Sequence, residues 1–191
     1  MVREQQSLRI RFLSRNQHKI DEVQAILRSV NVEVIASNTA IEELQTTDTA
    51  KLVRDKCLRA FRQIGHALFV EHTGLYIKSL NGFPGGLTQI FWDTLDADRI
   101  SAIFGKQPDP AVTARTVIGY CDGKRIHQFA GEVVGRIAEQ PRGPRDFQWD
   151  CVFIPDGYEK TFAELGVVKN EISMRRRALD AFCKYLRGQQ E

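Results

Sequence analysis

Residues 8–36 read LRIRFLSRNQHKIDEVQAILRSVNVEVIA, which is the pattern of a strand, a helix and a second strand. Residues 8–13 alternate apolar and basic side chains, as a half-buried strand does. Asn16 is a favourable helix N-cap, and the apolar residues that follow it at helical spacing are Ile20, Val23, Ile26, Leu27 and Val30. Residues 32–36 form a second short apolar run. This order predicts two parallel strands joined by a crossover helix.

The same alternation continues to residue 74. Asp48 or Thr49 is expected to cap a helix that reaches about Ile64 and ends at Gly65. Residues 67–70 are apolar throughout and run directly into Glu71-His72-Thr73-Gly74. We expect that segment at the carboxyl end of a buried strand, the edge where open α/β sheets bind ligands. The order β-α-β-α-β predicts a largely parallel sheet with helices on its faces.

The rest of the chain is expected to contain a loop, two helices and a hairpin. Residues 81–86, NGFPGG, are rich in breakers of regular structure and predict a loop. Residues 88–105 predict an amphipathic helix, and a last helix is expected over residues 173–186. Residues 112–121 and 125–137 are β-rich and joined by a CDGK turn, which predicts a long hairpin. The predicted fold class is therefore α/β, with a central mixed, largely parallel sheet and a long β-hairpin.

Length and composition exclude several classes of protein. The 191 residues suffice for one domain, or for a domain of two lobes, with its own core. A net charge of +3 is too small to indicate a nucleic-acid polymer as partner but is compatible with a small anionic ligand. The four cysteines form no CxxC pair, which argues against a zinc site and a disulfide framework. Without an apolar signal segment or membrane span, a reduced, cytoplasmic protein is expected.

Residues 147–177, FQWDCVFIPDGYEKTFAELGVVKNEISMRRR, suit a ligand with a flat ring and several negative charges, a description that a purine nucleotide fits. Two aromatic side chains, Phe147 and Trp149, lie beside the acid Asp150, and several basic residues follow in the same run. An aromatic face suits a flat ring, and fixed cations suit the negative charges of phosphates.

The turn at residues 14–19, SRNQHK, is a candidate phosphate site. Backbone N–H groups at a helix N-terminus, with Lys19 one turn into the helix, can bind an anion. A strand followed by an Asn-capped helix also occurs in α/β proteins without a ligand there, so this turn alone is weak evidence.

Two acidic segments are candidates for metal binding. Glu43 lies in an acidic loop before the helix that carries Lys56, and Mg²⁺ prefers a few carboxylates together with phosphate oxygens. A solvated acidic loop is the simpler explanation. Glu71 and His72 follow a buried strand, where an acid suits metal binding or activation of water, whereas a histidine more often makes an ordinary hydrogen bond.

Six motifs occur in a fixed order along the chain: SxNxxK at residues 14–19, ELQ at 43–45, VEHTGL at 70–75, NGFPGG at 81–86, FQWD with FIPDGYEKTFAEL at 147–165, and KNEISMRRRAL at 169–179. Over essentially the whole chain they resemble the Ham1-like inosine triphosphate pyrophosphatase family. The resemblance implies a single elongated domain of residues 1–191, with two lobes around a central cleft, and a homodimer. It also implies that the cleft binds ITP, dITP or XTP with Mg²⁺ and that hydrolysis between the α- and β-phosphates releases a monophosphate and pyrophosphate.

The resemblance also implies roles for the residues that match the family's motifs. The residues expected to bind the nucleotide are Asn16, Lys19, Lys56, Phe147, Trp149, Asp150, Lys169, Ser173 and Arg175. Phe147 and Trp149 would flank the base, and Arg175 would donate to its 6-oxo group. A guanidinium donor suits that carbonyl and clashes with the amino group of adenine. The residues expected to hold metal are Glu43 and Glu71, and those expected in catalysis are Glu71 and His72.

Five positions depart from the family's pattern. His72 stands where the family usually has a second aspartate, the group taken to activate water or to bind metal. A neutral imidazole could serve as a base, but it cannot supply the charge that Mg²⁺ requires. The other differences are Met174 for histidine, Arg15 for glycine, Gln148 for glycine and Cys151 for proline.

These differences leave three hypotheses open. In the first, the protein binds dITP, ITP or XTP with weak or lost hydrolysis and acts as a nucleotide sensor for a partner effector protein, for example in an antiviral or stress response. In the second, it is an active Mg²⁺-dependent pyrophosphatase that removes such nucleotides from the pool. In the third, it is a folded relative that binds nothing tightly. Losing a catalytic base costs about 10²–10⁴ in rate, and affinity can survive that loss because it is a separate quantity.

Overall fold

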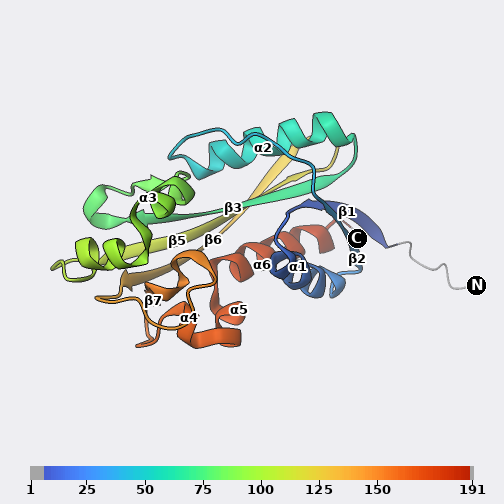
Figure 1. The fold of residues 1–191 in the computed structure, drawn as a ribbon. Helices are drawn as coiled ribbons and strands as arrows, with labels where there is room; N and C mark the ends of the chain where they lie inside the picture. The colour runs from blue at the N-terminus through green and yellow to red at the C-terminus, as the bar shows by residue number, and fades with distance from the viewer. Residues whose placement is uncertain (1–6, 190–191) are drawn as a thin grey trace, which may run out of the picture.

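The computed structural model describes residues 7–189 and shows an α/β fold around one sheet (Figure 1). The strands are β1 (Leu8–Leu13), β2 (Val32–Ser37), β3 (Leu68–Ile77), β4 (Pro84–Gly85), β5 (Ala111–Cys121), β6 (Ile126–Ile137) and β7 (Phe153–Pro155). The α-helices are α1 (Gln17–Arg28), α2 (Thr49–Ile64), α3 (Thr88–Ile100), α4 (Phe162–Leu165), α5 (Lys169–Ile172) and α6 (Met174–Arg187). The strand order is β2-β1-β3-β5-β6-β7, with β4 paired to β3.

The first half of the fold is the predicted β-α-β-α-β unit. β1 pairs in parallel with both β2 and β3. The predicted helix caps are present: Asn16 Oδ1 accepts from the backbone N–H of Lys19 at 3.1 Å, and Asp48 Oδ1 accepts from that of Lys51 at 3.0 Å. Gly65, at φ 69°, ends α2 in the left-handed region that glycine favours.

The second half of the sheet is antiparallel. β3 pairs with β5, β5 with β6, and β6 with β7 in this direction, so parallel pairing is confined to β2-β1-β3. The predicted α/β class, mixed sheet and long hairpin are confirmed. The expectation that the sheet is largely parallel is wrong, because the strands from β3 to β7 pair in the antiparallel direction. The predicted division into two lobes stays a prediction.

β3 is longer than the sequence indicates. It continues through Glu71, His72 and Gly74 to Ile77, because β5 pairs with it along its whole length. The expectation that Glu71 and His72 follow the end of a strand is therefore wrong. Since successive side chains of a strand point to opposite faces, these two neighbours lie on opposite sides of the sheet.

The helix expected at residues 88–105 is interrupted. Asp96 has φ 58° and ψ 179° within α3, and its Oδ1 accepts from the backbone N–H of Arg99 at 3.1 Å. This hydrogen bond is of the kind that an N-cap makes, and a second helical segment begins there. A π-helical turn, Ser101–Gly105, follows it.

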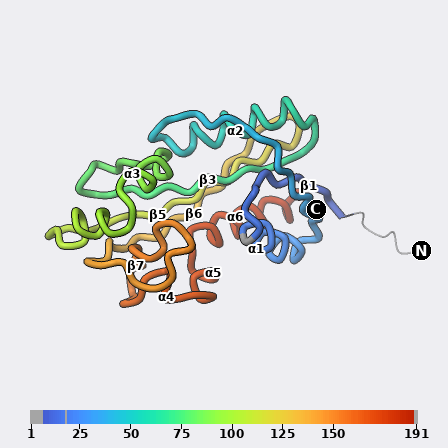
Figure 2. The backbone as a smooth tube through the Cα atoms, in the orientation of Figure 1, coloured from blue at the N-terminus to red at the C-terminus, as the bar shows by residue number. Residues whose placement is uncertain are grey.

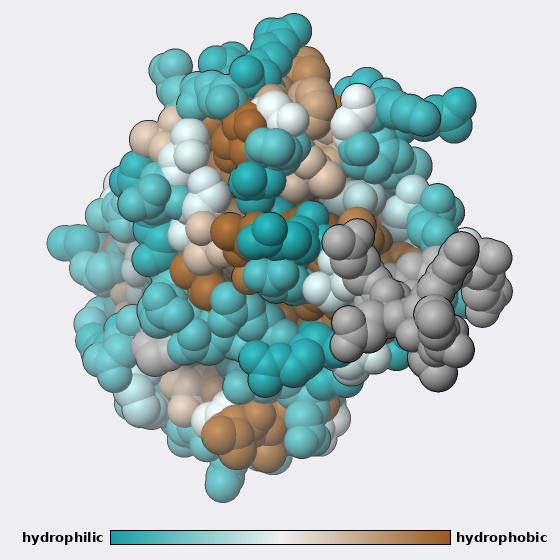
Figure 3. All heavy atoms as spheres, turned by 90° about the vertical axis from the view of Figure 1, so that its right-hand side faces the viewer, coloured by the Kyte–Doolittle hydropathy of each residue, from teal (hydrophilic) through white to brown (hydrophobic). Residues whose placement is uncertain are grey.

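Helices cover both faces of the sheet. α2 packs on one face, against β3 and β5, while α1 and α6 pack on the other (Figure 2). On the face covered by α1 and α6, Phe12 and Phe69 stack with ring centroids 4.5 Å apart, and Phe182 of α6 packs against Phe69. The surface seen in Figure 3 is largely hydrophilic, with apolar residues in separate groups. None of the helices within residues 7–189 has the length and apolar character needed to cross a membrane.

Candidate nucleotide site

Two cavities adjoin in this fold. The first, of about 700 Å³, is lined by the turn after β1, the loop at residues 39–43 and residues 146–148. The second, of about 640 Å³, lies between α1 and the segment that contains α4, α5 and the start of α6. Asp146 and Phe147 line both cavities.

The N-terminus of α1 lines the first cavity with groups that can bind an anion. Ser14 Oγ accepts from the backbone N–H of Asn16 at 3.2 Å, and this hydrogen bond and the Asn16 cap hold the turn in place. Lys19 Nζ lies 2.8 Å from Glu71 Oε1. A helix N-terminus beside an ammonium group favours a phosphate.

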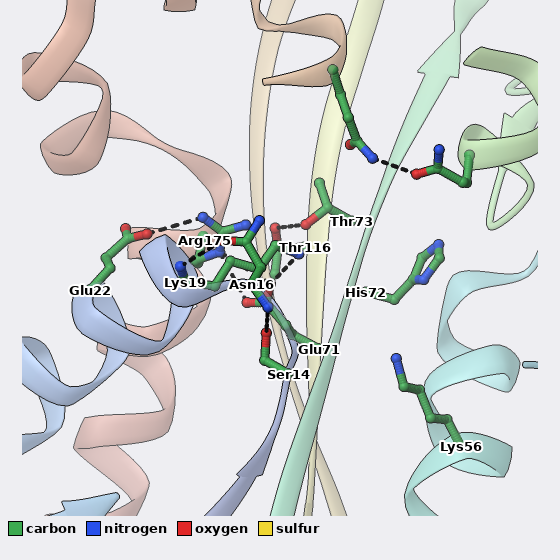
Figure 4. A network of polar contacts seen from close by, with 12 residues as sticks. Ser14, Asn16, Lys19, Glu22, Lys56, Glu71, His72, Thr73, Thr116 and Arg175 are labelled. Atoms are coloured by element: carbon green, nitrogen blue, oxygen red, sulfur yellow. Dashed lines mark hydrogen bonds and ion pairs between the residues drawn. The ribbon is translucent and has the colours of Figure 1, made fainter. Parts of the chain in front are cut away.

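Glu71 is buried and fully engaged by cations (Figure 4). Arg175 Nε lies 3.2 Å from Oε1 and 3.0 Å from Oε2, and Lys19 pairs with Oε1. Burial alone would raise the pKa of Glu71, but Arg175 and Lys19 lower it to about 2. Arg175 Nη1 also lies 3.0 Å from Glu22 Oε2. Glu71 is therefore ionised and joins α1 and α6 on one face of the sheet.

Glu43, Lys56 and His72 form a second polar group. Figure 4 shows Lys56 and His72 on the α2 side of β3. Glu43 Oε1 pairs with Lys56 Nζ, and Oε2 lies 3.7 Å from His72 Nδ1. Burial opposes ionisation of Glu43, but the charge of Lys56 holds its pKa below the ordinary value. Burial also lowers the pKa of His72, which favours a neutral imidazole near pH 7.

The second cavity contains an aromatic ring beside a buried ion pair. Lys169 Nζ lies 4.1 Å from the ring centroid of Phe147 and pairs with Asp150 Oδ2. Burial raises the pKa of Asp150 and lowers that of Lys169, and their attraction opposes both shifts. Asp150 Oδ1 is buried and has no hydrogen-bond partner within residues 7–189. It is an acceptor suited to a donor on a ligand.

The structure brings most of the predicted site residues to the two cavities. Those that line the first are Asn16, Lys19, Glu43, Lys56, Glu71 and Phe147, and those that line the second are Phe147, Asp150, Lys169 and Arg175. Three others lie elsewhere. Ser173 caps α6, accepting from the backbone N–H of Arg176. Trp149 is 2% exposed and packs against Phe153 in the core, and His72 lines neither cavity.

Glu22 is a site residue that the sequence prediction missed. It lines the second cavity, pairs with Arg175, and has a buried Oε1 without a partner among the described residues. Its spacing from Lys19, three residues along α1, places both on one helix face and is the signal that could have identified it.

The residues present fit a magnesium ion only in part. Within residues 7–189 no three histidine, cysteine or acidic side chains are placed to hold a metal ion together. Glu71 does not fit as a ligand, because both its oxygens contact cations and its side chain is 3% exposed. Glu43 fits as a single carboxylate for an ion whose other ligands are phosphate oxygens and water.

Comparison with known proteins gives consistent matches. A sequence profile of the Ham1 family matches residues 10–185. A dITP/XTP pyrophosphatase of Methanopyrus kandleri is 35% identical, over 95% of this chain and 97% of that protein. A dITP/XTP pyrophosphatase of Pyrobaculum aerophilum is 34% identical, over 94% and 96%.

Solved structures of similar proteins share the fold. A HAM1 protein from Coxiella burnetii superposes with a TM-score of 0.81 at 26% identity, covering 94% of this chain and 98% of that one. The Ham1 protein of Staphylococcus aureus has a TM-score of 0.76 at 23% identity, covering 95% and 99%.

Proposed function

Because the chain belongs to the Ham1 family, we propose that its two cavities together bind one noncanonical purine nucleoside triphosphate, such as dITP, ITP or XTP. One observation carries this proposal: a cavity with two lysines and a helix N-terminus shares Phe147 with a cavity of aromatic and hydrogen-bonding groups. The first matches a triphosphate and the second matches a base. The names of the relatives, dITP/XTP pyrophosphatases, support the substrate class.

The second cavity matches the edge of hypoxanthine or xanthine. Arg175 uses Nε and Nη1 for Glu71 and Glu22, and no hydrogen bond within residues 7–189 engages Nη2. Nη2 would donate to the 6-oxo group, and Asp150 Oδ1 would accept from the N–H beside that carbonyl. Adenine has an amino donor in place of the 6-oxo acceptor and a bare ring nitrogen in place of the N–H. It would therefore leave Arg175 Nη2 and Asp150 Oδ1 without partners. Phe147 and Lys169 would cover the base.

In the first cavity, Lys19 and Lys56 would bind the phosphates. Each now pairs with a carboxylate, Glu71 and Glu43 respectively, so the triphosphate would replace protein carboxylates as the partner of these cations. A magnesium ion that entered with the triphosphate would be held by Glu43 and would offset part of the phosphate charge. Asn16 would keep the N–H groups at the start of α1 oriented toward the phosphates.

The proposed reaction is hydrolysis between the α- and β-phosphates. Water adds to phosphorus, and the bond from that phosphorus to the bridging oxygen breaks. The proton that the water loses passes to solvent, and a nucleoside monophosphate and pyrophosphate leave. The names of the relatives favour this activity. We propose that it is slow in this chain, because burial lowers the pKa of His72, which favours a neutral imidazole, and because His72 lies on the far side of β3 from Glu71. Glu71 itself is committed to Lys19 and Arg175.

The commitment of Glu71 to Lys19 and Arg175, with His72 outside both cavities, also favours a second candidate function. In it the protein binds the nucleotide without hydrolysing it. In this case nucleotide occupancy would be the signal, and a partner effector protein would receive it, for example in an antiviral or stress response.

We also propose that the protein is a homodimer. Light scattering would then give twice the 21.8 kDa of one chain.

One experiment separates these functions. Purified protein is incubated with dITP and Mg²⁺, the products are separated, and binding is measured by titration with dITP and with dATP. Release of dIMP and pyrophosphate over many turnovers supports the enzyme. Micromolar binding of dITP without product supports the sensor. Equal affinity for dITP and dATP would overturn the proposed recognition of the base.

A further inference from the structure

Gln148 has a backbone conformation that a side chain other than glycine rarely adopts. It begins a 3-10 turn, Gln148–Cys151, directly after Phe147, and its φ is 40°. The left-handed region costs about 1–2 kcal/mol for most residues, so a glutamine held there needs a compensating contact. That contact is a hydrogen bond from its side chain to Gln89 on α3.

The amide of Gln148 is oriented by two further side chains. Gln89 Nε2 donates to Asp93 Oδ1 at 2.8 Å, and a carboxylate can only accept. Gln89 therefore presents its Oε1 to Gln148, and Gln148 must direct its own Nε2 toward Gln89. The acceptor-only carboxylate of Asp93 thus determines which atom of each amide is the oxygen and which is the nitrogen. Gln148 Oε1 is left as an acceptor, and no hydrogen bond within residues 7–189 uses it.

Gln148 lies where a bound pentose would be expected. It lines the first cavity, with Lys19 and Lys56, but not the second. Its neighbour Phe147 lines both. In a nucleoside triphosphate the pentose joins the base to the phosphates, so it must pass this boundary.

We infer that Gln148 is a further nucleotide-binding residue whose Oε1 accepts a hydrogen bond from a pentose hydroxyl, and that Gln89 is its positioning residue. The inference rests on the proposed function and deepens it. A hydroxyl donor matches the free acceptor, and either the 3′- or the 2′-hydroxyl has the required chemistry. Asp93, Gln89 and Gln148 then form a chain of hydrogen bonds that ends on the sugar.

The test uses α,β-imido analogues of dITP, ITP and 2′,3′-dideoxy-ITP, whose bridging nitrogen resists hydrolysis. Gln148→Met keeps the length of the side chain and removes the amide. It is expected to raise Kd about 5-fold for the analogues that carry the contacted hydroxyl, the effect of one hydrogen bond, and to leave the dideoxy analogue unchanged. If the variant loses affinity for both the dITP and the ITP analogue, the contacted group is the 3′-hydroxyl. If it loses affinity for the ITP analogue alone, the contacted group is the 2′-hydroxyl.

Three further variants separate recognition from packing. Gln148→Gly suits the backbone at φ 40° and is expected to show the same loss without a lower melting temperature. Gln89→Leu leaves Gln148 in place but removes its orientation, so the loss should have the same pattern and be smaller. Gln140→Met, at an exposed position that lines neither cavity, is the matched control and should change nothing.

With Gln148→Met, two results would overturn the inference: an equal loss of affinity for all three analogues, or no loss for any of them. If the wild-type protein binds the three analogues with equal affinity, the inference fails and the proposed function stands. If the wild-type protein binds none of them, both fail.

Discussion

Glu71 and His72 are adjacent in sequence but belong to different polar groups. Glu71 lies with Lys19 and Arg175, and His72 lies beside Glu43 and Lys56. Strand geometry causes this separation. A charge change at either position should therefore affect a different property of the protein: turnover at His72, and stability at Glu71.

His72→Asp is expected to raise the rate of dITP hydrolysis by about 10²-fold, the lower range for a catalytic acid or base. The new carboxylate would lie beside Glu43 and Lys56, and would be a second carboxylate available to a magnesium ion that enters with the triphosphate. The measurement is kcat for pyrophosphate release. His72→Asn, which is neutral, should leave kcat low. An equal rate for the two variants would show that the charge at this position is not what limits turnover.

Glu71→Gln is expected to destabilise the protein by about 3–5 kcal/mol at pH 7, because it leaves Arg175 buried without its main partner. The pKa of Glu71 is about 2 in the folded protein, below its ordinary value of 4.5. Its contribution is therefore fully present above pH 4.5 and decreases as the pH falls toward 2. Urea unfolding at several pH values should show that the difference in free energy of unfolding between wild type and variant becomes smaller over that range.

The control for this pH effect is Glu33→Gln. Glu33 pairs with Arg9 on the surface, where both side chains are more than half exposed. Such a pair contributes about 0–1 kcal/mol, so the variant should unfold like the wild type. A gap between wild type and Glu71→Gln that stays constant from pH 7 to pH 3 would contradict the assigned role of Glu71.

At the scale of elements, local signals were sufficient for most of the fold. The caps at Asn16, Asp48 and Gly65 and the helical spacing of apolar residues are properties of short segments, and they predicted α1 and α2. The extension of β3 to Ile77 depends on pairing with β5, which comes more than thirty residues later in the chain. The break at Asp96 depends on a cap inside a segment whose apolar pattern continues.

The candidate site divides in the same way. Lys19, Lys56 and Phe147 could be assigned from motifs, because each motif stays in one short segment. The pairing of Glu22 with Arg175 and that of Gln148 with Gln89 join parts of the chain that are distant in sequence. No periodicity or spacing reports such contacts, so only the fold reveals them.

The packing of α6 on β6 offers a test at this scale. A Cβ on Gly131 would lie 2.2 Å from the carbonyl oxygen of Met174 and 2.5 Å from the nitrogen of Ala178, so Gly131→Ala must displace the start of α6. We expect a loss of about 1–3 kcal/mol in stability. Affinity for dITP should also fall, because Arg175 lies in that first turn.

Gly188→Ala is the matched control for this substitution. Its nearest neighbours would be 3.7 and 3.9 Å from the new Cβ, and its φ of −68° suits alanine. Stability should stay within about 0.5 kcal/mol of the wild type, and binding should be unchanged. If Gly131→Ala loses stability but binds dITP as tightly as the wild type, the position of Arg175 does not depend on this contact.

At the scale of the whole molecule, the site gathers segments from both ends of the chain. The turn after β1 supplies the phosphate side, and residues 146–150 with the start of α6 supply the base side (Figure 1). Glu71, on β3 between them, pairs with Lys19 of α1 and Arg175 of α6. A ligand that bridges the two cavities should therefore order all these segments together.

Hydrogen exchange with and without a hydrolysis-resistant dITP analogue measures this directly. Slower exchange is expected in residues 13–20, in residues 146–152 and in residues 169–178, because one ligand contacts each segment. Residues 121–126, at the end of the β5–β6 hairpin, line neither cavity and should exchange at the same rate in both states. Hypoxanthine deoxyriboside, which lacks phosphates, should slow exchange only in the last two of the three segments. If the triphosphate analogue also leaves residues 13–20 unchanged, the two cavities do not bind one nucleotide, because its phosphates would then not reach the N-terminus of α1.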